Sequence, residues 1–149
     1  MAEVKTLALA KGKKPYYIAT YDNSYNDHEM SERIAKHQKQ REERFISIEE
    51  SHKLEKVITQ ENTYLIDCIS MWILNNIKKN EKELLATLEK LSNINSNIVF
   101  VLNDVNSGII PLDKESRKFV DLTGIIGQKL AEFCDEVYEV KLGLTIKLK

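Results

Sequence analysis

Short apolar runs that alternate with amphipathic stretches predict strands separated by helices. Three runs are rich in the β-branched and aromatic residues that favour strands, namely Tyr16–Thr20, Thr63–Asp67 and Ile98–Asn103. The third lies within residues 97–104, whose continuous apolar core is typical of a parallel strand covered on both faces. This alternation predicts an α/β fold with a mostly parallel sheet flanked by helices.

Apolar residues at helical spacing, together with capping signals, predict the remaining elements. The predicted helices are 27–44, 46–58, 68–78, 81–91 and 114–134, preceded by the end of a helix over residues 1–11. In the second of these, Ser47 is expected to be the N-cap and Glu50 to complete a capping box. Gly143 separates two apolar runs and predicts a C-terminal β-hairpin.

Composition and charge indicate one globular domain and argue against two kinds of partner. The chain has 149 residues, of which 42% are hydrophobic and 30% charged, which is enough to bury a core. Its net charge of -1 provides no basic field for nucleic acid or an anionic membrane. No apolar run approaches the roughly 18 residues of a membrane span, and the first residues lack a signal-peptide layout. We expect a single cytoplasmic domain over residues 1–149, without a membrane span or a nucleic-acid partner.

The two cysteines, Cys68 and Cys134, lie far apart in apolar segments, which predicts two buried, reduced thiols. Together with three scattered histidines, they show no spacing typical of a metal site. Trp72 is expected in the core of the protein.

Four side chains at intervals of four residues form the first candidate site. Glu29, Arg33, His37 and Arg41 would be successive neighbours on the surface of a helix. A neutral imidazole is a nucleophile near pH 7, and flanking arginines bind phosphoryl oxygens. The pattern therefore suits the handling of a phosphate. It also describes an ordinary solvated helix face, which is the interpretation that spacing alone favours.

Two acids follow predicted strands. Asp67 ends one strand and Asp104 comes just after another. Acids at the carboxyl ends of parallel strands lie where α/β proteins bind ligands, and there they often hold Mg²⁺ or a ligand hydroxyl. The alternative for Asp67 is to cap the helix that follows it, and the residues alone favour neither interpretation. No G-x-x-x-x-G-K-[ST] phosphate loop occurs in the chain.

Several motifs follow one another along the chain: Tyr-Ile-Ala-Thr at 17–20, Glu-Met-Ser-Glu-Arg-Ile-Ala-Lys-His at 29–37, Leu-Ile-Asp-Cys-Ile at 65–69, and Asn-Asp-Val with Gly-Ile-Ile-Pro over 103–111. In this order they resemble the motifs of the bifunctional adenosylcobinamide kinase / adenosylcobinamide-phosphate guanylyltransferase family. The likeness covers essentially the whole chain, although Asp104 replaces the usual Glu, and Asn106 and Ser107 replace a Gly-x pair. Met1 aligns after the strand and the Gly-rich Lys-Ser loop with which the family begins.

The fold that this resemblance implies is the RecA-like sheet of a P-loop NTPase, lacking its first strand and P-loop. The domain of residues 1–149 would then be incomplete at its N-terminus. Because the missing strand is normally central, its neighbours are expected to have unpaired backbone groups, which would favour aggregation.

The resemblance also implies two linked reactions of cobalamin biosynthesis, with GTP, ATP and Mg²⁺ as cofactors. The family phosphorylates adenosylcobinamide and then transfers GMP from GTP to adenosylcobinamide phosphate through a guanylylated histidine, here His37. It assembles as a homotrimer. The implied nucleotide-binding residues are Thr20, Tyr21, Asp22, Gln38, Lys39, Gln40, Arg41, Glu49 and Asp67, with Asp67 also a candidate Mg²⁺ contact. The implied supporting residues are Glu29, Arg33 and Asp104.

The missing phosphate loop leaves alternatives to an active enzyme. Without its backbone N–H groups and lysine, the chain is expected to bind GTP weakly and to lack kinase activity. A catalytically inactive truncated remnant, or a module that binds nucleotide or phosphate without turnover, fits this departure. His37 and Asp67 favour the enzyme.

Overall fold

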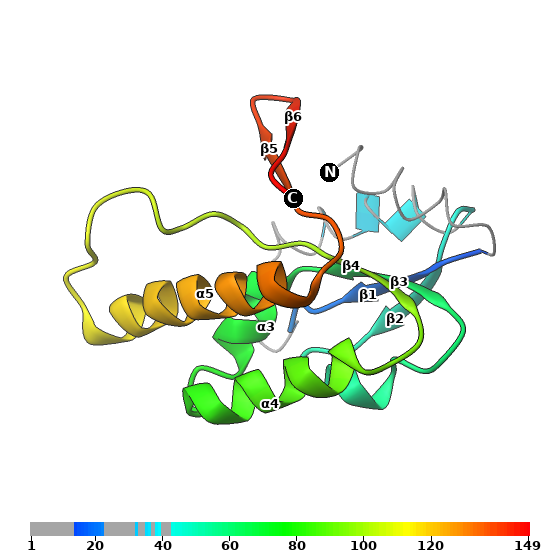
Figure 1. The fold of residues 1–149 in the computed structure, drawn as a ribbon, viewed down its shortest axis with the longest axis horizontal. Coiled ribbons are helices and arrows are strands. Elements are labelled where there is room, and N and C mark those ends of the chain that lie inside the picture. Colours follow the sequence, from blue (N-terminus) through cyan, green and yellow to red (C-terminus); the bar gives the residue numbers. More distant parts are fainter. Residues whose placement is uncertain (1–13, 23–31, 33–34, 37, 40–42) are drawn as a thin grey trace.

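A parallel β-sheet forms the centre of the fold in the computed structural model, which describes residues 14–22, 32, 35–36, 38–39 and 43–149 (Figure 1). The strands are β1 (Tyr16–Ala19), β2 (Ile46–Glu49), β3 (Thr63–Asp67) and β4 (Asn97–Phe100), in the order β2-β1-β3-β4. All three pairings are parallel, which confirms the α/β class.

The two inner strands, β1 and β3, are paired on both sides. Tyr64 in β3, for example, is in register with Tyr16 of β1 and with Ile98 of β4. The described strands thus form one continuous sheet. The expectation of unpaired backbone groups beside a missing strand stays a prediction for the outer strands β2 and β4, which each pair on one side only within the described residues.

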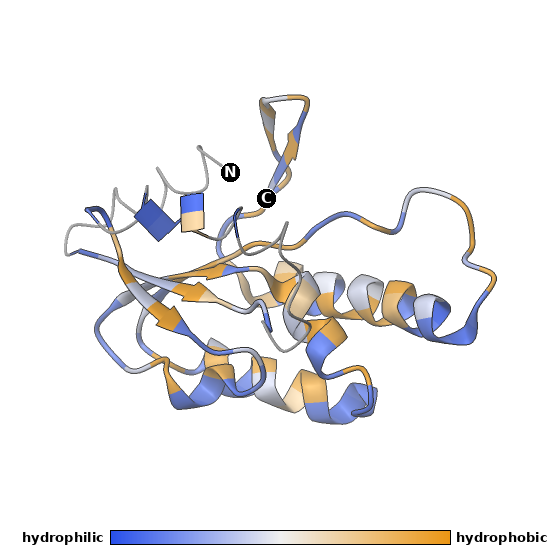
Figure 2. Ribbon diagram, turned by 180° about the vertical axis from the view of Figure 1, so that it is seen from behind, coloured by the Kyte–Doolittle hydropathy of each residue, from blue (hydrophilic) through white to orange (hydrophobic). Residues whose placement is uncertain are grey.

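Three helices cover one face of this sheet: α3 (Ile69–Asn75), α4 (Glu81–Ser92) and α5 (Lys114–Phe133) (Figure 1). Their apolar sides join Ile18 and Ile66 of the sheet in the main core, where Trp72 is fully buried as predicted. In Figure 2 the helices α4 and α5 show both hydrophobic and hydrophilic residues, as amphipathic helices do. Asn80 begins α4 with a capping box, because its side chain accepts from the N–H of Glu83 while the Glu83 carboxylate accepts from the N–H of Asn80.

The opposite face of the sheet carries a smaller apolar cluster of Tyr17, Phe45 and Leu65, with Ala19 packed against it. Tyr17 and Ala19 of β1, like Leu65 and Asp67 of β3, lie two residues apart, so each pair shares a face. The side chain of Asp67 therefore belongs to the face opposite the helices.

The helix predicted over residues 46–58 is wrong. Ile46 and Ile48 belong to β2, which pairs with β1, and only Leu54–Lys56 forms a short 3-10 helix, η2. Ser47 lies within the strand and caps nothing. The carboxylate of Glu50 accepts hydrogen bonds from the N–H groups of His52 (2.9 Å) and Lys53 (2.8 Å), so it organises the turn after β2.

The strand expected to be covered on both faces, β4, is only partly covered, and it is the last strand in the order of the described sheet. It ends at Phe100, and its residues are exposed or half-buried, whereas four of the five residues of β3 are buried. Val101 still donates its N–H to the carbonyl of Ile66 (3.2 Å) before the chain leaves the sheet. The cysteines are free, with Cys68 buried as predicted and Cys134 only half-buried.

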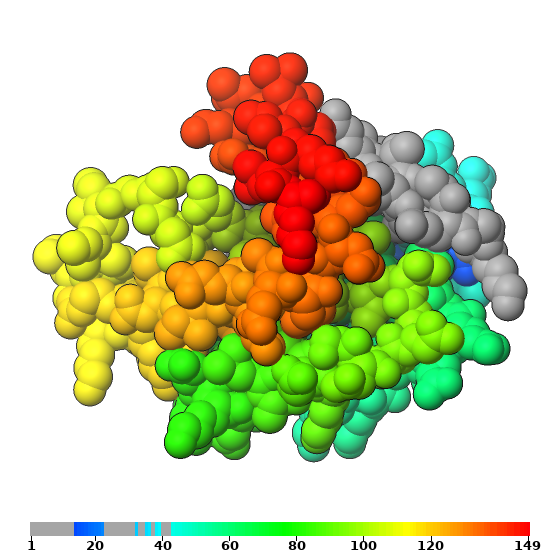
Figure 3. Space-filling view, in the orientation of Figure 1, coloured from blue at the N-terminus to red at the C-terminus, as the bar shows by residue number. Residues whose placement is uncertain are grey.

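The predicted hairpin is confirmed as β5 (Tyr138–Lys141) and β6 (Leu144–Lys147). Leu142 (φ 54°) and Gly143 (φ 77°) form its tight turn, a conformation that glycine adopts without strain. In the space-filling view the hairpin, in red, protrudes from the surface (Figure 3).

Within the predicted helix 27–44, the described residues Glu32, Ala35, Lys36, Gln38 and Lys39 are helical. The predicted helix end over residues 1–11 lies outside the described residues. Among the described helices, none has the length and apolar composition needed to cross a membrane.

Candidate active site

Two acids flank one strand at the carboxyl end of the sheet. Ala19 of β1 is in register with Glu49 of β2 on one side and with Asp67 of β3 on the other. In-register partners on parallel strands point to the same face, and neighbouring strands lie about 4.8 Å apart. Glu49 and Asp67 are therefore on one face, with their backbones about 10 Å apart, across the end of β1.

Asp67 is held by a tyrosine of the neighbouring strand. The hydroxyl of Tyr17 in β1 donates a short hydrogen bond to Oδ2 of Asp67, which is half-buried. The N-cap residue of α3 is Cys68, and no side chain caps that helix. The alternative in which Asp67 caps the helix is therefore wrong, and its carboxylate faces the sheet end instead.

Thr20 locks the end of β1 to the end of β3. Its side chain is fully buried, and its hydroxyl donates to the carbonyl of Cys68 (2.7 Å) and accepts from the N–H of Cys68 (2.8 Å). The N–H of Thr20 also donates to the carbonyl of Asp67 (3.2 Å). The half-buried Tyr21 and Asp22 thus begin their loop from a fixed point.

The structure brings one further predicted pair together. Nε2 of Gln38 donates to Oε1 of Glu49 at 3.5 Å, at the outer limit for a hydrogen bond. Lys39, the next residue, is exposed. The described part of the helix over 27–44 therefore approaches the end of β2. The predicted site residues Glu29, Arg33, His37, Gln40 and Arg41 lie outside the described residues.

Asp104 is not joined to the other acids. It is exposed in the loop after β4, where its carboxylate accepts from the N–H of Asn106 (3.1 Å) and the hydroxyl of Ser107 (3.3 Å). A cavity of about 370 Å³ lies between this loop and α5. Gly124 of α5 permits the approach, because a Cβ atom there would lie 2.9 Å from Nδ2 of Asn106.

Asn103, rather than Asp104, contacts the elements that surround Asp67. The N–H of Asn103 donates to the hydroxyl of Ser70 in α3 (2.8 Å), and its amide nitrogen lies 3.9 Å from the sulfur of Cys68. Burial, and to a lesser extent the charge of Asp67, raise the pKa of the Cys68 thiol. The thiol is therefore neutral at pH 7.

Sequence reasoning missed three residues that organise the site: Tyr17, Ser70 and Asn75. Asn75, at the end of α3, donates to the carbonyls of Thr20 (2.7 Å) and Ser51 (2.9 Å). Tyr17 and Ala19 are two residues apart in a predicted strand, so the sequence did indicate that their side chains share one face of the sheet. The contacts of Ser70 and Asn75 depend on where α3 docks, which no local pattern reveals.

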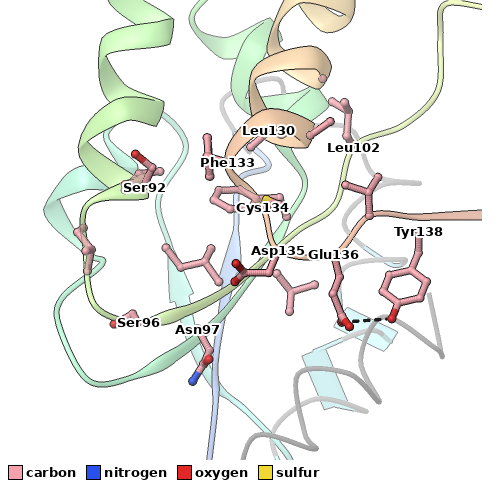
Figure 4. A pocket seen from close by; sticks show the side chains of 18 of the residues that line it. Ser92, Ser96, Asn97, Leu102, Leu130, Phe133, Cys134, Asp135, Glu136 and Tyr138 are labelled. Atoms are coloured by element: carbon pink, nitrogen blue, oxygen red, sulfur yellow. Dashed lines mark hydrogen bonds between the residues drawn. The ribbon is translucent and has the colours of Figure 1, made fainter. Parts of the chain in front are cut away.

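A larger groove, of about 690 Å³, lies elsewhere, at the edge of β4 with which no other described strand pairs (Figure 4). It is lined by the end of α5 and the base of the hairpin, where the hydroxyl of Tyr138 donates to Glu136 (3.2 Å). None of the residues that the sequence singled out for the site lines this groove.

Comparisons with known proteins match the chain to one family along nearly its whole length. The family model for cobinamide kinase / cobinamide phosphate guanyltransferase matches residues 2–148. A bifunctional adenosylcobalamin biosynthesis protein CobP of Pseudomonas aeruginosa is 32% identical over 152 residues, covering 96% of this chain and 87% of that protein. The bifunctional adenosylcobalamin biosynthesis protein CobU of Escherichia coli is 26% identical, covering 89% of this chain and 84% of that protein.

Proposed function

Because the chain belongs to the cobinamide kinase / cobinamide phosphate guanyltransferase family, we propose that it is a transferase of cobalamin biosynthesis. It transfers GMP from GTP to adenosylcobinamide phosphate. The family's other reaction, phosphorylation of adenosylcobinamide with ATP, is expected to be lacking in these 149 residues, because they contain no phosphate loop. The observation that carries this proposal is the match along nearly the whole chain, combined with acids at the carboxyl ends of parallel strands.

The guanylyl transfer proceeds through His37 in two steps. An imidazole nitrogen of His37 bonds to the α-phosphorus of GTP, the bond to the bridging oxygen breaks, and pyrophosphate leaves. An oxygen of adenosylcobinamide phosphate then attacks the same phosphorus, and the nitrogen–phosphorus bond breaks. Arg41 binds the phosphoryl oxygens and stabilises their charge in both steps.

The remaining nucleotide contacts come from the ends of β1 and β2 and from the helix beside them. Tyr21 and Asp22 follow the fixed end of β1, and Gln38 and Glu49 approach each other at the end of β2. Lys39 is exposed and free to reach a phosphate, with Gln40 next to it in the sequence. Glu29, Arg33 and Asp104 support these contacts.

Asp67 fits the role of a Mg²⁺ contact. Its Oδ2 accepts from Tyr17, while Oδ1 has no hydrogen bond within the described part of the chain. No group of three acidic, histidine or cysteine side chains that could hold a metal occurs among the described residues. An ion bound to Asp67 would take most of its oxygen ligands from phosphate and water, as Mg²⁺ usually does, and would neutralise phosphate charge.

Three finer statements belong to the same proposal. The enzyme binds adenosylcobinamide and adenosylcobinamide phosphate as substrates, and it assembles as a homotrimer. It acts in the cytoplasm, which its two free cysteines support. Sedimentation of the purified protein tests the trimer directly.

The guanylyl step is tested with GTP labelled at the α-phosphate, supplied at millimolar concentration. We expect a covalent adduct that disappears in mild acid and survives alkali, as a nitrogen–phosphorus bond does. His37→Ala should abolish the adduct, and Arg41→Ala should slow its formation. Matched controls are His28→Ala and His52→Ala, which should label like the unaltered chain.

Three outcomes would count against this function. Labelling that persists in His37→Ala, or that maps to His28 or His52, refutes the assignment of the nucleophile. Reversible GTP binding with no adduct under any condition supports a binding module instead. Absence of both binding and labelling supports the inactive remnant.

A further inference from the structure

Side chains of helix α3 donate hydrogen bonds to backbone carbonyls of two separate loops of the candidate site. Nε1 of Trp72 donates to the carbonyl of His52 (2.9 Å), which follows β2. Asn75 reaches the carbonyl of Thr20, which follows β1, and the carbonyl of Ser51, which follows β2. The helix itself begins directly after Asp67 and Cys68. Its end thus holds the segments that follow β1 and β2.

Asn75 differs from the other side chains of α3 because one amide group joins two segments. Both of its amide hydrogens are used, at 2.7 Å to Thr20 and 2.9 Å to Ser51. These acceptors lie 55 and 24 residues away in the chain. The amide therefore fixes the spacing between the start of the loop at Tyr21 and the turn that begins at Glu50.

The segments that Asn75 joins are the ones to which the proposed function assigns nucleotide contacts. Tyr21 directly follows the carbonyl that Asn75 binds, and Glu49 lies two residues before Ser51. The hydroxyl of Thr20 is buried and hydrogen-bonded to the backbone of Cys68. Thr20 therefore contributes by holding the end of β1 in place. Displacing a binding group by about 1 Å is enough to lower activity substantially.

From this geometry we infer that Asn75 is a positioning residue, which holds the loops after β1 and β2 at the spacing that nucleotide binding requires. This inference rests on the proposed function for its nucleotide and on the two hydrogen bonds for its geometry. Asn75 itself touches no reacting atom. Its removal should weaken the binding of GTP while leaving the transfer chemistry at saturating GTP nearly unchanged.

The decisive substitution is Asn75→Asp in the whole chain. The carboxylate has almost the same shape, but it donates no hydrogen bond and places negative charge against two carbonyl oxygens. The matched control is Asn93→Asp, because the amide of Asn93 also donates to a carbonyl, that of Glu89 (2.8 Å), on the surface at the end of α4. Asn75→Ala removes the donor without adding charge and serves if the Asp variant does not fold.

Two measurements test the inference. In the labelling assay, Asn75→Asp should raise the half-saturating concentration of GTP by about ten-fold or more, with the maximal rate within about two-fold. Amide exchange without nucleotide should become about ten-fold faster at Tyr21, Asp22, His52 and Lys53. Asn93→Asp should change neither.

An unchanged GTP dependence in Asn75→Asp overturns the inference, as does a loss of maximal rate with no change in half-saturation. If the unaltered chain takes no label, the proposed function fails. The exchange measurement then still decides whether Asn75 holds the two loops together, and unchanged exchange rates overturn that part as well.

Discussion

The hydroxyl of Tyr17, in the middle of one inner strand, donates a hydrogen bond to the carboxylate of Asp67, at the end of the other. The bond runs diagonally across the strand pair, because Tyr17 is in register with Leu65 and Asp67 with Ala19. It fixes one oxygen of the carboxylate against the sheet and leaves the other without a hydrogen bond within the described part of the chain. Asp67 is thus oriented before any ligand arrives.

Tyr17→Phe should therefore lower the free energy of unfolding by about 1–2 kcal/mol, because the half-buried carboxylate loses a hydrogen bond. Urea denaturation measures the change. Tyr16→Phe is the matched control, since the Tyr16 ring stacks on Tyr64 and its hydroxyl has no hydrogen bond within the described part of the chain. Equal stabilities of the two variants would show that the bond to Asp67 contributes nothing.

The turn after β2 depends on the ionised form of Glu50. The pKa of this carboxyl group is lowered from its ordinary value of 4.5, mainly by the hydrogen bond from the N–H of Lys53. The N–H and the charge of His52 lower the pKa further, whereas burial opposes the shift. Because the folded pKa lies below the unfolded one, the stabilisation is fully present above about pH 4.5 and is lost as the pH falls through the folded pKa. Glu50→Gln should lower stability by about 1 kcal/mol at pH 7, or about 2–4 °C in Tm.

The difference in Tm between Glu50→Gln and the unaltered chain should shrink steadily from pH 5 to pH 3. Glu55→Gln removes the same charge five residues later, from a side chain with no hydrogen bond among the described residues, and should have a smaller effect throughout. A difference for Glu50→Gln that is constant with pH would contradict the role of its carboxylate.

Elements whose stability is mainly local were predicted well from the sequence. The helices α4 and α5 carry their own signals, a helical spacing of leucines and isoleucines and caps at Asn80 and Asp113. The hairpin carries Gly143 at its turn. The segment 46–58 failed because β2 is a strand only through its pairing with β1, and no pattern within four residues reports that contact.

The same division applies to the site. Glu49 was predicted from the resemblance alone, and Asp67 from the resemblance and from its position at the end of an apolar run. Parallel pairing places both at one end of the sheet. Tyr17 and Asn75 were missed, because the role of each depends on strand register or helix docking. The apolar run Ile98–Leu102 predicted a strand covered on both faces, whereas the residues of β4 are exposed or half-buried.

Trp72 is the largest fully buried side chain of the main core and should be its most sensitive position. Trp72→Ala leaves a cavity under the sheet and releases the carbonyl of His52, so the free energy of unfolding should fall by about 3–5 kcal/mol. Leu74→Ala, two residues along the same helix but 42% exposed, should cost less than about 1 kcal/mol. Urea titrations followed by circular dichroism compare the two, and similar losses would show that α3 docks differently.

The thiols of Cys68 and Cys134 should differ in access and share a low reactivity. Burial raises the pKa of both from the ordinary 9.0, so the reactive thiolate is scarce at pH 8 and the reaction rate should keep rising beyond pH 9. Cys134 is half-buried and should react first with a chromogenic disulfide, whereas Cys68 is 7% exposed beneath the Thr20 contact and should react only when the protein opens.

Cys68→Ser and Cys134→Ser assign the fast and slow phases of this reaction, and in urea both thiols should react at once. Thr20→Val, which removes the hydroxyl that holds Cys68 on both sides, should accelerate the slow phase and leave the fast one unchanged. Rapid modification of Cys68 in the native chain would show that the corner between β1 and β3 is open.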